Sequence, residues 1–185
     1  MNIAVYSGSF NPLHTGHLAI LRYLVGEGGY DCVYLIVSPK NPLKDGISAD
    51  SGTDRFNAAA EAVKRHFHEK VKVDDIELTM PAPHYTIRTL DALREREPGN
   101  AFTLVMGADN LADIRRWRDY GRILKEYGTA VYPRKGFDLN VVKDELLEED
   151  ASYKIDILKA EMVDISSTII RDAIARGQEM SGWLM

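Results

Sequence analysis

The chain has 185 residues, of which 45% are hydrophobic and 28% are charged, an ordinary globular composition that is long enough to bury a substantial core. The 23 Lys and Arg against 28 Asp and Glu give a net charge of −5, which argues against bulk binding of nucleic acid or of an anionic membrane surface. A single cysteine, Cys32, excludes an intrachain disulfide and a thiolate metal cluster.

Apolar runs rich in β-branched residues alternate with helix-like patterns along the chain. The predicted strands cover residues 3–6, 32–37, 71–78, 102–106, 129–132 and 155–158. The predicted helices cover residues 18–25, 54–67, 86–95, 111–127 (with a break near Trp117), 139–147 and 168–176. This alternation predicts a single Rossmann-like α/β domain, residues 1–185, whose open and mostly parallel sheet carries helices on both faces.

The start of the chain lacks the basic residues that open a signal peptide, and it reads as the first strand. No apolar run is long enough to span a bilayer. We therefore expect a cytoplasmic protein with no membrane partner, and the sequence leaves open whether it forms a homo-oligomer.

The segments that follow the predicted strands collect small, hydroxyl-bearing, histidine and cationic residues. These segments are residues 7–12, 38–44, 79–85, 107–109, 133–136 and 165–168. In an open parallel sheet, ligands bind outside the carboxyl ends of the strands. An acidic protein with this local bias is suited to a phosphate-bearing ligand.

The sharpest motif is GSFNPLHTGH, residues 8–17, which lies between the first predicted strand and a helix. The backbone N–H groups of Ser9 and Phe10 can point into the cleft, and the helix presents its own N–H groups and positive dipole end. Gly16 would let the backbone approach a phosphate closely, because it has no side chain.

The same motif carries two histidines three residues apart. His14 and His17 can lie on one side of the helix start and donate to the same phosphate. The alternative interpretation is a turn and helix cap with two solvent-exposed histidines.

A second candidate anion site precedes the last predicted helix. Ser166, Ser167 or Thr168 would cap this helix, and Arg171 stands one turn inside it on the same side. Hydroxyls, helix-start amides and a guanidinium together can bind an anion. The alternative is simple capping with the arginine in solvent.

The GSFNPLHTGH segment resembles the H-x-G-H signature of the nucleotidyltransferase superfamily. Further segments are similar to bacterial nicotinate mononucleotide adenylyltransferases. They are YTIRTL at residues 85–90, GADNL at 107–111 with Trp117 beyond it, Arg134 after a strand, and ISSTIIR at 165–171. These matches keep the family's order and cover nearly the whole chain.

The resemblance implies adenylyl transfer from ATP to nicotinate mononucleotide, which yields deamido-NAD and pyrophosphate in NAD biosynthesis. The implied catalytic residues are His14, His17, Lys44 and Arg171. The implied ATP-binding residues are Gly8, Ser9, Phe10, His14, Gly16, His17, Gly107, Asp109, Ile165, Ser166, Ser167 and Arg171. The implied acceptor-binding residues are Lys44, Tyr85, Thr86, Trp117, Arg118 and Arg134.

Several of these roles come from the resemblance alone. It implies that Trp117 stacks on the pyridine ring and that the backbone N–H groups of Thr86 and Arg118 meet the nicotinate carboxylate. Read from the residues, Trp117 could equally be a core anchor. Asp109, which the resemblance puts near a ribose or the acceptor, could simply cap a helix. Arg134 could meet a phosphate or lie in a solvated turn.

One loop departs from the family's pattern. The family has two prolines, a histidine and a basic residue after the second strand, whereas this chain has Asn41, Pro42, Leu43 and Lys44. The histidine is missing, and Lys40 could compensate for it.

No sequence motif indicates a metal held by protein ligands. A Mg²⁺ held by ATP phosphates and water would leave no motif. Two alternatives remain for the function. One is an adenylyltransferase for another phosphate monoester, such as nicotinamide mononucleotide or phosphopantetheine. The other is a non-catalytic nucleotide-binding module of the same fold.

Overall fold

The β-branched runs of the sequence form six strands in the computed structural model, which describes residues 1–39, 52–160 and 165–185. The strands are β1 (Asn2–Gly8), β2 (Cys32–Val37), β3 (Val71–Asp74), β4 (Ala101–Gly107), β5 (Thr129–Tyr132) and β6 (Ile155–Ile157). They pair in the order β3-β2-β1-β4-β5-β6, and every pair is parallel. The predicted α/β class with an open parallel sheet is confirmed.

Helices connect the strands, as a parallel sheet requires. The longer helices are α1 (Thr15–Val25), α2 (Gly52–Phe67), α4 (Thr86–Arg96), α7 (Leu139–Glu149) and α8 (Ser167–Ala175). The shorter ones are α3 (Ile76–Thr79), α5 (Ala108–Ala112), α6 (Tyr120–Arg122), a π turn (Ile123–Tyr127) and two 3₁₀ turns, Ile114–Arg116 and Ser181–Trp183.

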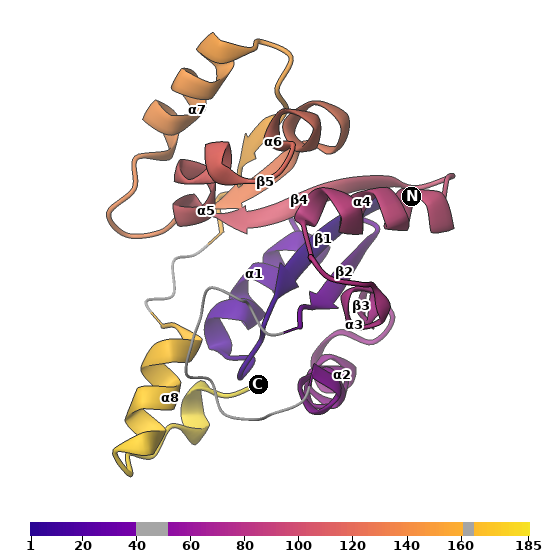
Figure 1. Cartoon of the computed structure of the whole chain (residues 1–185). Coiled ribbons are helices and arrows are strands. Elements are labelled where there is room, and N and C mark those ends of the chain that lie inside the picture. Colours follow the sequence, from indigo (N-terminus) through magenta and orange to yellow (C-terminus); the bar gives the residue numbers. More distant parts are fainter. Residues whose placement is uncertain (40–51, 161–164) are drawn as a thin grey trace.

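The sheet is covered on both faces, as predicted (Figure 1). Alternate residues of β1 point to opposite sides, so Ile3 and Val5 join one buried cluster with residues of α4 and α7. Ala4 and Tyr6 join a second cluster with residues of α1 and α2. Burial on both faces explains why an inner strand such as β2 is apolar throughout, whereas the edge strands β3 and β6 alternate apolar and polar residues.

The chain reverses its direction of winding at β1. From β1 it moves outward through β2 to β3, and it then returns to place β4 on the other side of β1. This reversal is a topological switch point, where parallel sheets open a crevice at the carboxyl ends of their strands. The GSFNPLHTGH segment after β1 and the GAD segment after β4 therefore flank the same crevice.

One predicted strand differs from the structure. The strand predicted over residues 71–78 is wrong beyond Asp74, because the chain turns there into α3. The Asp74 carboxylate accepts from the Ile76 N–H at 3.0 Å, and the Asp75 carbonyl accepts from the Leu78 N–H at 2.8 Å. These bonds stabilise a turn where the hydrophobic pattern alone suggested a continued strand.

The predicted break near Trp117 is confirmed. Trp117 ends the 3₁₀ turn Ile114–Arg116, and Asp119 then adopts a left-handed φ of 53°. A helix cannot continue through this conformation, so α6 starts afresh at Tyr120.

Candidate active site

The turn after β1 places its aromatic residue in the core. The chain takes a positive φ of 43° at Phe10, whose side chain is buried. The Phe10 ring packs at 5.4 Å from the Tyr6 ring and at 5.2 Å from the His17 ring. A Cβ at Gly8 would lie 3.0 Å from the Phe10 ring. Phe10 therefore leaves only its backbone for a ligand, as the sequence analysis expected, and Gly8 makes room for its ring.

The two histidines of the motif lie against each other at the start of α1. Their rings stack with centroids 3.7 Å apart. The Gly16 N–H donates to His14 Nδ1 at 3.2 Å, and the His14 N–H donates to His17 Nδ1 at 3.2 Å. A ring nitrogen that accepts carries no proton, so each neutral imidazole holds its proton on Nε2. The backbone thus fixes two Nε2–H donors side by side.

The surroundings keep both rings uncharged near neutral pH. Burial, helped by the positive charge of Arg134, lowers the pKa of His14 to about 4. Burial also lowers the pKa of His17 well below its ordinary value, with His14 and Arg134 as smaller causes. The pair therefore acts through hydrogen-bond donation rather than through a standing positive charge.

Gly16 is needed for the packing of this turn. A Cβ there would lie 3.0 Å from the His14 ring and 3.1 Å from Cγ2 of Ile165. The sequence suggested that the glycine lets a phosphate approach. The structure adds that any side chain at this position would push against the His14 ring that the turn orients.

The start of α8 packs on the turn after β1. Ser166 caps the helix by accepting from the Ile169 N–H at 3.3 Å, and the Ser167 hydroxyl donates to the Pro12 carbonyl at 3.0 Å. Arg171 donates to the Asn11 carbonyl at 2.6 Å and to the Thr168 hydroxyl at 3.1 Å. The two segments that the sequence singled out as separate anion sites, residues 8–17 and 165–171, therefore form one continuous surface.

The segment after β4 faces this surface from the other side of the switch point. The helix α5 has Gly107 as its N-cap residue, and Asp109 lies inside the first turn of the helix. The capping interpretation of Asp109 is therefore wrong. Its carboxylate instead lies 3.4 Å from Nε of Arg134. A Cβ at Gly107 would collide with this carboxylate and with the Tyr132 ring.

Arg134 lies near the histidines. Its guanidinium stands 5.4 Å from the centroid of the Tyr132 ring and donates to the Tyr132 hydroxyl at 3.4 Å. Its charge contributes to the low pKa of both His14 and His17. The sequence analysis groups Arg134 with the acceptor-binding residues, and this assignment stays a prediction. Arg134 does not line the pocket described next.

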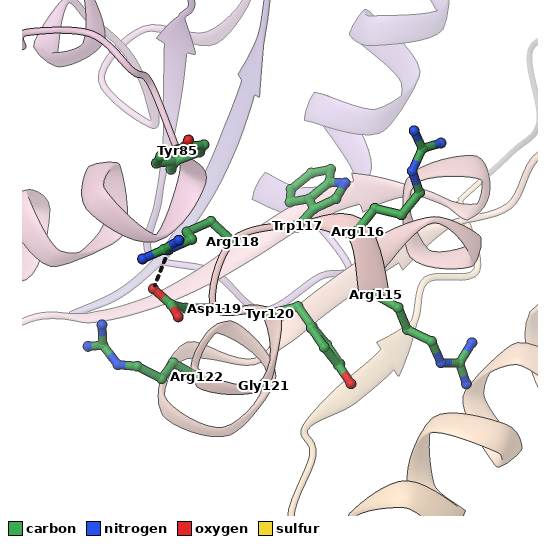
Figure 2. Close-up of a pocket in the computed structure, with 9 residues that line it drawn as sticks. All are labelled: Tyr85, Arg115, Arg116, Trp117, Arg118, Asp119, Tyr120, Gly121 and Arg122. Carbon is green, nitrogen blue, oxygen red and sulfur yellow. Dashed lines mark ion pairs between the residues drawn. The ribbon is translucent and has the colours of Figure 1, made fainter.

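A pocket of about 670 Å³ brings together three of the predicted acceptor-binding residues (Figure 2). It is lined by Tyr85, Arg115, Arg116, Trp117, Arg118, Asp119, Tyr120, Gly121 and Arg122. Tyr85 is exposed and precedes Thr86, the first residue of α4. Trp117 is partly buried and packs against the core. It thus offers both of the roles that the sequence left open, a core anchor and a ring face.

Four arginines line the pocket, and three of them form ion pairs with acidic side chains. Arg115 pairs with Glu149, and Arg122 pairs with Asp91 and Glu126. Arg118 is exposed and lies 3.5 Å from the Asp119 carboxylate, as the dashed line in Figure 2 shows. Arg115 and Arg122 therefore support the pocket walls.

Two buried charged residues near the crevice escaped the sequence analysis. Arg55 of α2 is 8% exposed and donates to the carbonyls of Ser9 at 2.6 Å and Ser38 at 2.8 Å. It thereby holds together the chain segments that leave β1 and β2. A signal was present, because Arg55 falls on the apolar stripe of its helix with Ala59 and Ala62.

The second is Glu77 of α3, which is 4% exposed. The sequence does not single out Glu77, because residues 71–78 read as one strand.

The predicted phosphate contact Lys44, its neighbour Leu43 and the compensating Lys40 lie outside the described residues.

The described part of the chain, which leaves out residues 40–51 and 161–164, brings together no group of three or more His, Cys, Asp or Glu residues that could bind a metal ion. Among the same residues, every helix is too short or too polar to cross a membrane.

The chain is similar to known proteins over nearly its whole length. A family model described as cytidylyltransferase-like matches residues 5–173. The parallel sheet and the matched segment together define the class, and the chain belongs to the cytidylyltransferase-like family.

Individual relatives narrow the class. A Flavobacterium johnsoniae protein called "Probable nicotinate-nucleotide adenylyltransferase" is 36% identical over 97% of this chain and 90% of its own length. A Bacteroides fragilis protein of the same name is 36% identical over 97% of this chain and 85% of its own. Within its family, the chain thus groups with proteins of this name, which confirms the resemblance found in the sequence.

A solved structure shares the fold. The nicotinic acid mononucleotide adenylyltransferase of Plasmodium falciparum, solved with NaAD, superposes with a TM-score of 0.76 and 18% identity. The alignment covers 96% of this chain and 86% of that one.

Proposed function

We propose that the protein transfers the adenylyl group of ATP to nicotinate mononucleotide, yielding deamido-NAD and pyrophosphate. The names of the relatives support this activity. The observation that carries the proposal is the pair of Nε2–H donors fixed at the start of α1, at the switch point where parallel sheets bind nucleotides.

The reaction requires one bond to form and one to break at the α-phosphorus of ATP. A phosphate oxygen of the acceptor attacks this phosphorus, the bond to the β-phosphate oxygen breaks, and pyrophosphate leaves. The attacking oxygen is already ionised near neutral pH, so no general base is needed. The protein must align two anionic substrates and stabilise the charge that develops between them.

The histidine pair suits this task. Neutral His14 and His17 can donate from Nε2 to the α-phosphate and to its bridging oxygen without first gaining a proton. Arg171, which is bonded to the turn that carries the pair, and Arg134, whose charge acts on both rings, can take the leaving pyrophosphate. Lys44 is assigned to the acceptor phosphate. Each donor of this kind is typically worth ~10²–10³ in turnover.

The pocket beside α4 suits the pyridine ring. In this proposal the ring stacks on Trp117, and the ring carboxylate accepts from the backbone N–H groups of Thr86 and Arg118. Thr86 supports this role because the first N–H groups of a helix have no partner within the helix.

We further propose that ATP enters with Mg²⁺ held by phosphate oxygens and water. The side chains gathered at the crevice are mainly N–H donors, which fit the phosphate oxygens rather than the cation. When bound, the metal would neutralise charge on the leaving phosphates.

The cytoplasmic location expected from the sequence stays a prediction. Whether the protein forms a homo-oligomer stays open, as it does in the sequence.

Pyrophosphate release from ATP tests the proposal with a panel of acceptors. The panel contains nicotinate mononucleotide, nicotinamide mononucleotide and phosphopantetheine, with a reaction lacking any acceptor as control. We expect the highest kcat/KM with nicotinate mononucleotide. A preference for phosphopantetheine, or ATP binding without turnover of any acceptor, would contradict the proposal.

A further inference from the structure

A buried carboxylate lies between the two halves of the proposed site. Glu77 comes from α3 and is 4% exposed. A buried carboxylate is costly unless hydrogen bonds compensate for the lost water. Its partners therefore indicate what holds it there.

Those partners are two hydroxyl groups from segments far apart in the sequence. The Thr89 hydroxyl donates to Glu77 Oε1 at 2.8 Å, and Thr89 is itself 1% exposed. The Ser7 hydroxyl lies 3.3 Å from the same oxygen and 2.9 Å from the Ser38 hydroxyl. The carboxylate thus joins the end of β1 to the first turns of α4.

Both ends of this link lead directly to site residues. Ser7 is followed at once by the GSFNPLHTGH turn that carries the histidines. On the other side, the Thr89 N–H donates to the Tyr85 carbonyl at 3.3 Å, and Tyr85 and Thr86 begin the helix at the acceptor pocket. A shift of α4 relative to β1 would move the acceptor ring relative to the α-phosphate.

We infer that Glu77 is a positioning residue that sets the acceptor-binding start of α4 relative to the phosphate-binding turn. It acts through Thr89 and Ser7 and touches no substrate. The inference rests on the proposed function, because it assumes that an acceptor binds at Tyr85 and Thr86. A misplacement of about 1 Å can cost about 10²-fold in rate, so a buried link of this kind has a measurable effect.

The test compares Glu77→Gln and Thr89→Val with wild type, and uses Glu95→Gln on the exposed side of α4 as the matched control. Glu77→Gln keeps the shape but replaces the charged oxygen that accepts from both hydroxyls with a weaker, neutral acceptor. Thr89→Val removes the hydroxyl. We expect each to raise the acceptor KM about 5- to 20-fold, with a smaller change in the ATP KM. The control should match wild type.

Two further measurements separate positioning from folding. The double variant should resemble the worse single variant, because both changes act on the same bond between Thr89 and residue 77. Thr89→Ser, which keeps the hydroxyl, should stay closer to wild type than Thr89→Val. Melting temperatures of all variants show which remain folded.

Failure of this inference is distinguishable from failure of the proposed function. Wild type without turnover of nicotinate mononucleotide would refute the function itself. If wild type is active but folded Glu77→Gln and Thr89→Val keep the acceptor KM within twofold, the positioning role is wrong. It is also wrong if both substrates' KM values rise equally, since a general loosening of the fold would do that.

Discussion

Replacing His17 separates its structural contribution from its catalytic one. In the structure its Nδ1 accepts from the His14 N–H at 3.2 Å, a bond worth about 1 kcal/mol. Losing it should lower the melting temperature by about 2–4 °C in a chain of this size. Losing the Nε2–H donor should lower kcat by about 10²–10³, or roughly 3–4 kcal/mol.

The expected loss of stability is too small to explain the expected loss of turnover. A domain stabilised by about 5–15 kcal/mol stays almost fully folded after a loss of 1 kcal/mol, so partial unfolding cannot account for a hundredfold loss of turnover. His17→Ala should therefore remain folded and show both effects.

Two amide variants divide the roles further. In His17→Asn the side-chain oxygen lies near the position of Nδ1, so this variant should keep the bond from His14 and lose the catalytic donor. In His17→Gln the amide reaches toward the position of Nε2, so it should recover part of the turnover. Pyrophosphate release and thermal melting measure the two effects. Turnover of folded His17→Asn within tenfold of wild type would refute the assignment.

Three further predictions follow from the same geometry. Arg171→Ala should raise the ATP KM more than the acceptor KM in steady-state assays, and a change confined to the acceptor would mean that the two anion sites are assigned the wrong way round. Trp117→Ala should lower kcat/KM for nicotinate and nicotinamide mononucleotides by a similar factor, because both rings present the same face. Loss of the preference for the acid would contradict the view that Trp117 acts only by stacking on the ring. For His14, the pKa falls from 6.5 unfolded to about 4 folded, so the unfolded chain takes up a proton that the folded one does not. Stability should be complete above pH 6.5 and should fall toward pH 4 by up to about 1.4 kcal/mol per pH unit. His14→Gln should flatten that slope in thermal melts, and an unchanged slope would contradict the low pKa.

The architecture was predictable because its signals are local. Each strand is a short apolar run, and each connection carries a helical pattern, so the order of elements alone indicated the parallel sheet. Residues 71–78 were misread because the hydrophobic pattern continues to Leu78, while the carboxylate of Asp74 and the carbonyl of Asp75 turn the chain.

The candidate site was predictable only where a compact motif or a family resemblance marks it. Tyr85, Trp117 and Arg118 were expected together, and the structure gathers them around one pocket. Glu77 has no such signal in the sequence, and Arg55 has only its place on the apolar stripe of α2. Their partners lie far away along the chain, because Glu77 meets Ser7 across 70 residues and Arg55 meets Ser9 across 46. Such contacts depend on the register of the sheet, which no local pattern specifies.

The most direct test of the proposed activity is the formation of dinucleotide from ATP and nicotinate mononucleotide by the purified protein, with nicotinamide mononucleotide as the competing acceptor. Backbone N–H donors at Thr86 and Arg118 should favour a ring carboxylate, since an amide would turn its NH₂ group toward another donor. A site built on hydrogen bonds rejects such a mismatch strongly. We predict one pyrophosphate released per deamido-NAD formed, with a higher kcat/KM for the acid. Equal or greater kcat/KM for the amide would contradict the pocket, and no dinucleotide from either acceptor would contradict the proposed function.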